Sequence, residues 1–184
     1  LLPEYRGAAP INQAIIDGKS ETGISIITVA ERMDAGDILA QGKCSIEPDD
    51  TAETLHNKLA CLSPLTLLET VNRIAAGTAT YTPQDESRVS IARKLKKSDG
   101  FIDFSEPAQV LANKIRGLWP WPGVHADFVS GQTEKCHPVI FARGQVVSND
   151  DNPGTYGKVD ENLNILCGKD RLKILELKPA GKNR

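Results

Sequence analysis

Strand-like alternation is clearest between residues 23 and 41, in the stretch GISIITVAERMDAGDILAQ. Residues 23–30 are β-branched and partly alternating, as a half-buried strand requires, and strand chemistry resumes over 38–46. Between them Asp34-Ala-Gly-Asp37 supplies turn residues, because Gly36 tolerates backbone angles that other residues avoid. The pattern predicts a hairpin closed by a tight acidic turn at the rim of a sheet.

Asp34 and Asp37 are the two carboxylates of this rim. Catalytic groups are often carried by a loop on a rigid sheet. Asp and Gly are also common turn formers, so the spacing alone favours an ordinary structural turn.

Helical periodicity predicts three helices, over residues 10–17, 51–76 and 105–118. The second is expected to be capped by Asp50 or Thr51 and to kink, or to restart with Ser63 as a cap, at Pro64. The third is expected to start at a Ser105 cap, and Trp119-Pro-Trp-Pro-Gly123 is expected to end it with packed tryptophans. Its predicted buried face consists of Val110, Leu111, Ile115 and Leu118.

Short apolar runs separated by turn residues characterise the last third of the chain. A first short strand is predicted at residues 101–104, before the third helix. After that helix, strands are predicted at 124–129, 138–141, 155–159, 164–167 and 172–177, with turns such as Ser130-Gly131 and 149–154 between them. Strands at this spacing are typical of a small β-barrel, and such barrels often bind nucleic acids.

Composition indicates an ordinary globular protein of one domain or two small ones, with 184 residues, 40% hydrophobic and 25% charged. The net charge of −2 does not indicate a polyanion partner for the whole chain. Charge is uneven, however: residues 1–80 hold 6 basic against 11 acidic groups, and 81–100 hold 5 against 3. From the residues alone, 78–98 is better interpreted as a solvated connector than as a segment that contacts phosphate.

The four cysteines form no C-x-x-C pair and lack metal-ligand spacing, so we expect reduced thiols and no metal. No apolar run is long enough to span a membrane. The chain opens on Leu-Leu-Pro without Met and stops on Gly-Lys-Asn-Arg, so we expect a fragment cut at both ends. We therefore also expect the hairpin and the helix at 51–76 to expose apolar surface.

Several motifs, in order along the chain, resemble those of the folate-dependent formyltransferase family, and within it the members that act on methionyl-tRNA. They are Leu1-Leu-Pro-Glu-Tyr-Arg-Gly-Ala-Ala-Pro-Ile11, Glu21-Thr-Gly23, Met33-Asp-Ala-Gly-Asp-Ile-Leu39, Gln84-Asp-Glu86, Ile102-Asp-Phe104, Trp119-Pro-Trp-Pro-Gly123 and Leu177-Lys-Pro-Ala-Gly-Lys182. The resemblance covers essentially the whole chain.

The resemblance implies an α/β fold: the C-terminal part of a Rossmann-like catalytic domain (1–80), a linker (81–100) and a tRNA-binding OB-like barrel (101–184). It implies transfer of the formyl group of 10-formyltetrahydrofolate to the amino group of methionyl initiator tRNA. We expect the whole protein to be a cytoplasmic monomer that uses neither a membrane nor a metal.

The resemblance also implies roles for particular residues. Asp34 matches the catalytic acid, whereas Asp37 is assigned to the turn. The folate-contact segment is Leu1, Leu2 and Pro3. The family's Asn-x-His pair would precede Leu1, so we expect this chain alone to be inactive. The basic residues expected to meet tRNA are Arg88, Arg93, Lys94, Lys96, Lys97, Lys178 and Lys182.

Two other functions remain open. One is a formyltransferase of the same superfamily that acts on an amino sugar nucleotide or releases formate. The other is a non-catalytic RNA-binding module, in which Asp34 would have no use. The basic residues of the linker and of the C-terminal segment favour a tRNA acceptor over a sugar nucleotide.

Overall fold

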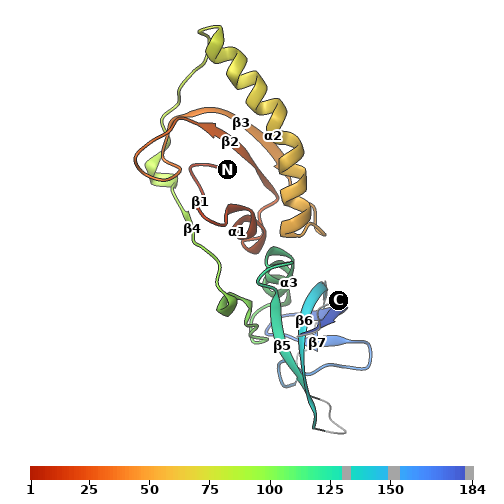
Figure 1. Cartoon of the computed structure of the whole chain (residues 1–184). Helices are drawn as coiled ribbons and strands as arrows, with labels where there is room; N and C mark the ends of the chain where they lie inside the picture. The colour runs from red at the N-terminus through yellow and green to blue at the C-terminus, as the bar shows by residue number, and fades with distance from the viewer. Residues whose placement is uncertain (130–133, 149–153, 181–184) are drawn as a thin grey trace. The chain divides into compact units, whose positions relative to one another are not determined.

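A computed structural model describes residues 1–129, 134–148 and 154–180 of the chain (Figure 1). The chain divides into two compact units. Unit 1 consists of Leu1–Ile15 and Lys19–Leu95, and unit 2 of Ile16–Gly18 and Lys96–Arg184. The predicted turn at Ser130-Gly131, most of the one at 149–154, and Lys182 lie outside the described residues.

Unit 1 contains the predicted hairpin, formed by β2 (Glu21–Ile27) and β3 (Ile38–Ser45). The strands pair antiparallel, with Ile24 opposite Gly42 and an irregularity between Ile26 and Ile27. The prediction of a tight turn is wrong, because β2 ends before Thr28 and a longer loop, residues 28–37, joins the strands. Thr28 closes this loop: its N–H donates to the Asp37 carbonyl at 3.0 Å, and its hydroxyl accepts from the Asp37 N–H at 2.9 Å.

Helix α2 (Ala52–Ala75) lies along the hairpin, and the short helix α1 (Pro10–Ile16) precedes it in the chain (Figure 1). The predicted Thr51 cap is confirmed: its hydroxyl accepts the Thr54 N–H, and the Thr54 hydroxyl accepts the Thr51 N–H. The alternative prediction, that a new helix begins with Ser63 as its cap, is wrong. The Ser63 hydroxyl instead donates to the Leu59 carbonyl at 2.8 Å, and α2 continues through Pro64.

The first half of α2 contributes residues to the core of unit 1, whereas the large apolar side chains of its second half are exposed. Leu65, Leu68 and Val71 keep half or more of their surface in solvent, so the expected apolar surface is observed on this helix. The buried cluster consists of Tyr5, Ala14, Ile15, Ile46, Ala52, Leu55, Leu59 and Ala92.

The segment that follows α2 differs from a solvated connector. Thr82 forms two main-chain hydrogen bonds with Ile38, of 2.8 and 2.9 Å. A 3₁₀ turn, η1 (Glu86–Arg88), follows, and β4 (Ile91–Ala92) then pairs in parallel with β1 (Arg6–Gly7). Residues 82–92 are therefore built into unit 1.

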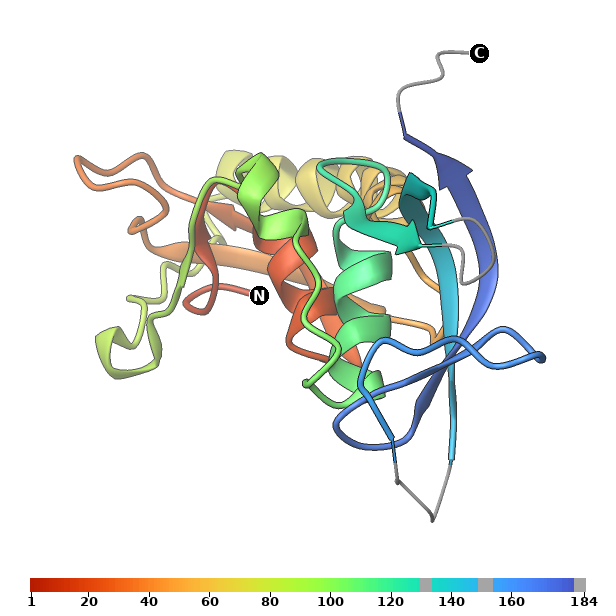
Figure 2. The same ribbon diagram turned by 90° about the horizontal axis from the view of Figure 1, so that it is seen from below.

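In the residues of unit 2 that the structure describes, a four-stranded antiparallel sheet has one helix packed on it (Figure 2). The strand order is β5 (Val124–Val129), β6 (Cys136–Val147), β8 (Arg171–Pro179) and β7 (Asn164–Leu166). Helix α3 (Ala108–Gly117) contacts β6 and β8 and follows a 3₁₀ turn, η2 (Lys97–Gly100). The buried residues of unit 2 include Leu111, Ile115, Leu118, Val124, Phe141, Ile165 and Leu172.

Several local predictions for unit 2 are wrong. Residues 101–104 and 155–159 form only isolated bridges, Phe101 with His125 and Val159 with Ile165. Helix α3 does not begin with a Ser105 cap: Pro107 occupies the N-cap position without a side-chain hydrogen bond, and the Ser105 N–H donates to the Asp103 carboxylate at 2.9 Å. The described strands form an open sheet, so the closed OB-like barrel stays a prediction.

Two side chains at either end of α3 are also more exposed than predicted. Val110 keeps 41% of its surface in solvent and is not among the buried residues of α3. Trp121 is 53% exposed, so this tryptophan is not packed in a core.

Candidate active site

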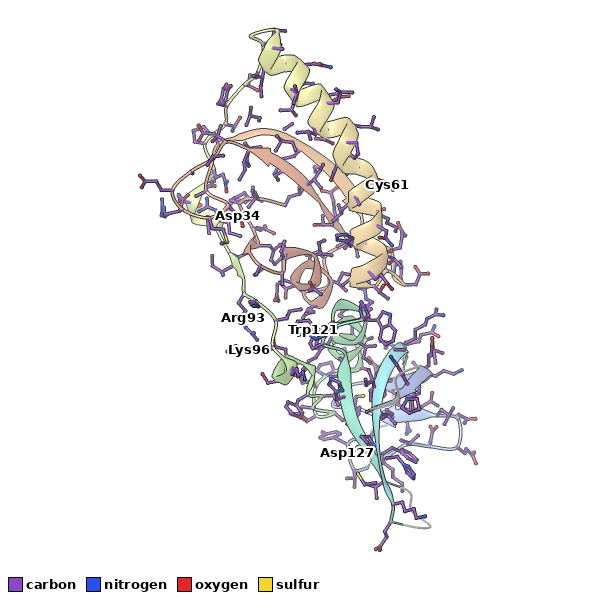
Figure 3. All side chains as sticks on the ribbon, viewed as in Figure 1. Asp34, Cys61, Arg93, Lys96, Trp121 and Asp127 are labelled. Atoms are coloured by element: carbon purple, nitrogen blue, oxygen red, sulfur yellow. The ribbon has the colours of Figure 1, made fainter. Side chains whose placement is uncertain are left out.

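Asp34 lies on the loop 28–37 at the edge of unit 1 (Figure 3). Its backbone has φ 56°, a left-handed conformation that Asp adopts more readily than most residues. Its Oδ2 atom accepts the Gly7 N–H at 2.7 Å. The carboxylate is therefore held by strand β1, which is 27 positions earlier in the chain.

Gly7 donates this hydrogen bond from an unusual backbone position. Its φ of +124° is one that residues with a Cβ rarely adopt, and a Cβ there would lie 2.6 Å from the Ala92 carbonyl oxygen. The absence of a side chain lets β1 approach β4 closely. The same geometry turns the Gly7 N–H toward Asp34.

Asp34 borders a hollow of about 200 Å³ on unit 1, and Leu1 and Leu2 line the same hollow. Pro3 is buried and does not line it. The Gln41 amide of β3 donates to the Leu2 carbonyl and to the Ser25 hydroxyl, each at 2.9 Å. The structure thus brings the predicted acid together with two of the three predicted folate-contact residues.

A second set of contacts holds the main chain of the acid loop. The Gln84 Nε2 atom donates to the carbonyl oxygens of Asp34 at 2.8 Å and Gly36 at 2.7 Å. The Gln84 Oε1 atom accepts from Arg6 Nε at 3.1 Å and Nη2 at 2.8 Å. Arg6 also pairs with Glu86 at 2.8 Å, and this hydrogen bond lowers the pKa of the Glu86 carboxyl.

The arrangement suits proton transfer from a bound amine. A carboxylate with one oxygen fixed by an N–H still offers its second oxygen to a ligand in the hollow. The apolar side chains of Leu1, Leu2 and Ile11 form a wall against which a flat ring system could pack.

The basic residues predicted to meet tRNA are exposed where the structure describes them, and those of unit 1 do not line this hollow. Arg93 and Lys94 belong to unit 1, and Lys96 and Lys97 begin unit 2 (Figure 3 labels Arg93 and Lys96). Arg88 lies 3.6 Å from Glu4. Lys178 lies on β8.

Arg6, Gly7 and Gln84 all lie in the motifs that resemble the family, but the sequence alone indicates no role for them. Positive φ at Gly7 leaves only a weak signal, because glycine is common in loops. The contact between Gln84 and the Asp34 loop spans 48 to 50 positions, and no local pattern indicates such a contact.

Within residues 1–129, 134–148 and 154–180, no group of three or more His, Cys, Asp or Glu side chains is arranged to hold a metal ion. In the same described ranges, no helix has both the length and the apolar character needed to cross a membrane.

Comparison with known families gives two consecutive matches. Residues 1–71 match the model of "Formyl transferase", and residues 94–184 match that of "Formyl transferase, C-terminal domain". Together the two models account for most of the chain.

Curated relatives match along the entire chain. The chain is 41% identical to the methionyl-tRNA formyltransferase of Bacillus licheniformis and 39% identical to that of Geobacter metallireducens. Each match covers 100% of this chain and 58% of the relative. The chain thus spans less than two thirds of the length of these relatives.

Solved structures share the fold. An N-formyltransferase from Helicobacter canadensis, in complex with folinic acid and dTDP-3-aminofucose, superposes with a TM-score of 0.71 at 16% identity, over 94% of this chain and 62% of that one. The methionyl-tRNA formyltransferase of Clostridium thermocellum gives 0.56 at 20% identity, over 79% and 60%.

Proposed function

The chain belongs to the formyl transferase family, and from this premise we propose that the whole protein transfers the formyl group of 10-formyltetrahydrofolate to the amino group of methionyl initiator tRNA. Relatives at 39–41% identity along the full chain carry the name methionyl-tRNA formyltransferase. Because the chain spans 58% of their length, activity, substrates and partners are part of the proposal.

The observation that carries the proposal is the hollow shared by Asp34, Leu1 and Leu2. A pterin ring has flat apolar faces and a polar edge. The leucines offer an apolar wall, and Asp34 and Ser25 offer polar atoms. The residues present therefore fit a formyl-folate co-substrate, which supplies an activated one-carbon group when it is bound.

Asp34 would then act on the acceptor. An amine that attacks a formyl carbon must lose a proton, and a carboxylate can receive it directly or through water. The Gly7 N–H holds Oδ2, so the carboxylate keeps one orientation toward the hollow.

In this proposal the linker and the C-terminal domain hold most of the tRNA. In the proposed division, residues 1–80 belong to the catalytic domain and 101–184 form an OB-like domain that binds tRNA. The segment 81–100 connects them, and its residues 82–92 also pair with unit 1. The supporting observation is the exposure of Arg93, Lys94, Lys96, Lys97 and Lys178. Exposed cations of this kind can contact phosphates. The reaction would take place in the cytoplasm.

An amino sugar nucleotide is the alternative acceptor, since one structural neighbour was solved with dTDP-3-aminofucose. At 16% identity that likeness supports the fold alone. The tRNA acceptor is better supported because the relatives with higher identity are named for it.

The test is formyl transfer by the full-length natural protein, with methionyl-tRNA and with an amino sugar nucleotide as acceptors. We expect turnover with methionyl-tRNA. Asp34→Asn should lower kcat roughly 10²- to 10⁴-fold, because the amide cannot accept the proton. Asp37→Asn is the matched control on the same loop and should stay within about threefold, because Asp37 does not line the hollow.

Preference for the sugar nucleotide would refute the tRNA acceptor. Equal activity of the Asp34→Asn and natural proteins would refute the role of Asp34. No transfer to any acceptor, with retained RNA binding, would favour the non-catalytic module.

A further inference from the structure

Gln84 contacts the acid loop at two points without lining the hollow itself. Both of its contacts go to main-chain carbonyls, those of Asp34 and Gly36. These carbonyls flank Ala35, the residue directly after the acid. The amide therefore spans the loop beside Asp34 and fixes the path of its backbone.

Arg6 fixes which way the Gln84 amide faces. Its Nε and Nη2 atoms both donate to Oε1, so a flipped amide would direct its own N–H groups at a guanidinium that has only donors. Arg6 is 6% exposed and also pairs with Glu86. A buried guanidinium needs such acceptors, so the orientation of Gln84 is strongly determined.

Apart from these contacts, the part of the loop that precedes Asp34 is weakly held. Val29 is fully exposed and Met33 is 74% exposed, so the residues before Asp34 bury little apolar surface. Asp34 itself has a φ of 56°, a conformation that surrounding contacts must maintain. Two adjacent residues of β1 supply those contacts: the Gly7 N–H holds the carboxylate, and the Arg6 side chain holds Gln84.

We propose that Gln84, oriented by Arg6, is the positioning residue that places the Asp34 carboxylate for formyl transfer. The inference rests on the proposed function, because it assigns Gln84 an effect only through Asp34. Nothing in this role requires Gln84 to touch either substrate.

The experiment is a double-mutant cycle in the full-length natural protein, with Gln84→Met, Asp34→Asn and the two combined. Gln84→Met preserves side-chain length and removes the amide. We expect it to lower kcat for methionyl-tRNA by about 10²-fold, the usual effect of misplacing a catalytic group by about 1 Å. The KM values for both substrates should stay within about threefold, since Gln84 does not line the hollow.

The combined variant should be no slower than Asp34→Asn alone. Once the acid has been removed, a shift of its loop has no further effect on kcat. Single-turnover measurements at high enzyme concentration allow the slow rates of these two variants to be measured and compared. Gln109→Met is the matched control: its amide donates to Asn113 at 3.0 Å on α3 of unit 2, and its loss should leave kcat unchanged.

Gln84→Glu separates positioning from simple support of Arg6. A carboxylate still accepts from the guanidinium, but it cannot donate to the carbonyls of Asp34 and Gly36 and repels them instead. We expect kcat to fall at least as far as in Gln84→Met. Full activity of Gln84→Glu would show that Gln84 serves only to satisfy Arg6, and would overturn the inference.

The outcomes separate the two proposals. Normal activity of Asp34→Asn defeats the assigned acid, whatever Gln84 does. An inactive Asp34→Asn protein beside a fully active Gln84→Met protein defeats only the positioning role. An equal loss from Gln84→Met in the presence and absence of Asp34 would show a general structural role and would also overturn the inference. If Gln84→Met does not fold, Gln84→Glu is taken through the same cycle.

Discussion

Gly7 combines a backbone constraint with a contact to the candidate acid. Gly7→Ala would place a Cβ 2.6 Å from the Ala92 carbonyl oxygen at a φ of +124°. We expect it to lower the free energy of unfolding of unit 1 by about 3 kcal/mol, through backbone strain together with the forced separation of β1 from β4. Hydrogen exchange of the β2 and β3 amides in the full-length protein measures this loss.

Gly77→Ala is the natural comparison for this variant. Gly77 also has a positive φ, of +68°, but a Cβ there would meet no atom within 4 Å. Gly77→Ala should lower the free energy of unfolding by about 1 kcal/mol, because only the left-handed backbone conformation disfavours the alanine. Equal losses from the two variants would show that the approach of β1 to β4 is not what requires Gly7.

At the scale of an element, the start of α2 depends on a buried carboxylate. The side chain of Asp50 is 5% exposed and lies 2.6 Å from the Lys58 ammonium. Burial raises the pKa of Asp50, but hydrogen bonds from Lys58, the Glu47 N–H and Thr54 outweigh it, and the net pKa is lowered. The ionised form is therefore the one that stabilises the folded state.

This carboxylate predicts a pH dependence. A lowered folded-state pKa contributes stability above the unfolded value of about 3.9, and this stability is lost as the pH falls through the folded-state pKa. Asp50→Asn should lower the free energy of unfolding by about 1–3 kcal/mol at pH 7, and its difference from the natural protein should shrink below about pH 4. Urea unfolding followed by circular dichroism between pH 2 and 7 measures this difference.

The exposed neighbour provides the control for this prediction. Asp49→Asn should change stability by less than about 0.5 kcal/mol at any of these pH values. A constant difference between Asp50→Asn and the natural protein across the pH range would contradict the assigned role of the Asp50 charge.

Elements whose residues carry their own signal were predictable from sequence. The β-branched run in β2, the Thr51 cap of α2 and the apolar stripe of α3 are local patterns, and the structure contains all three elements. The course of α2 through Pro64 was not predictable. The missing N–H of a proline argues for a break, whereas the helix continues to Ala75 and buries Thr70 beyond the proline.

The candidate site was predictable only in part, for a related reason. The acidic residues of the loop and the Leu-Leu-Pro segment could be picked out from the motifs. The partners that hold Asp34 come from residues 7 and 84, on either side of it in sequence. A glycine N–H and a glutamine amide have no sequence pattern that would connect them to a loop so far away.

At the scale of the whole molecule, the distribution of charge predicts how tRNA binding depends on salt. Each phosphate contact contributes about 0.7–0.9 to the slope of log K against log salt concentration. Lys94→Ala combined with Lys97→Ala should therefore reduce the slope by about 1.5. Titrations of the full-length protein with methionyl-tRNA at several NaCl concentrations give this slope.

A charge-matched variant controls for net charge. Lys19→Ala combined with Lys43→Ala removes two cations that are already paired with Glu4 and Glu21, at 3.2 and 2.8 Å. We expect this variant to keep the natural slope. Indistinguishable slopes for the two double variants would mean that the predicted linker cations do not meet phosphate.

The pairing of β1 with β4 also sets an order of events on the ribosome. Arg6, Gly7 and the loop 28–37 are synthesised before residues 84–92, and translation adds roughly 5–20 residues per second. For several seconds the nascent chain therefore carries the acid loop without Gln84, and the Arg6 guanidinium without either of its acceptors. Gln84 can reach the carbonyls of Asp34 and Gly36 only once residues 84–92 have left the exit tunnel. The candidate acid thus becomes competent only after a segment about 50 positions further along the chain has been synthesised.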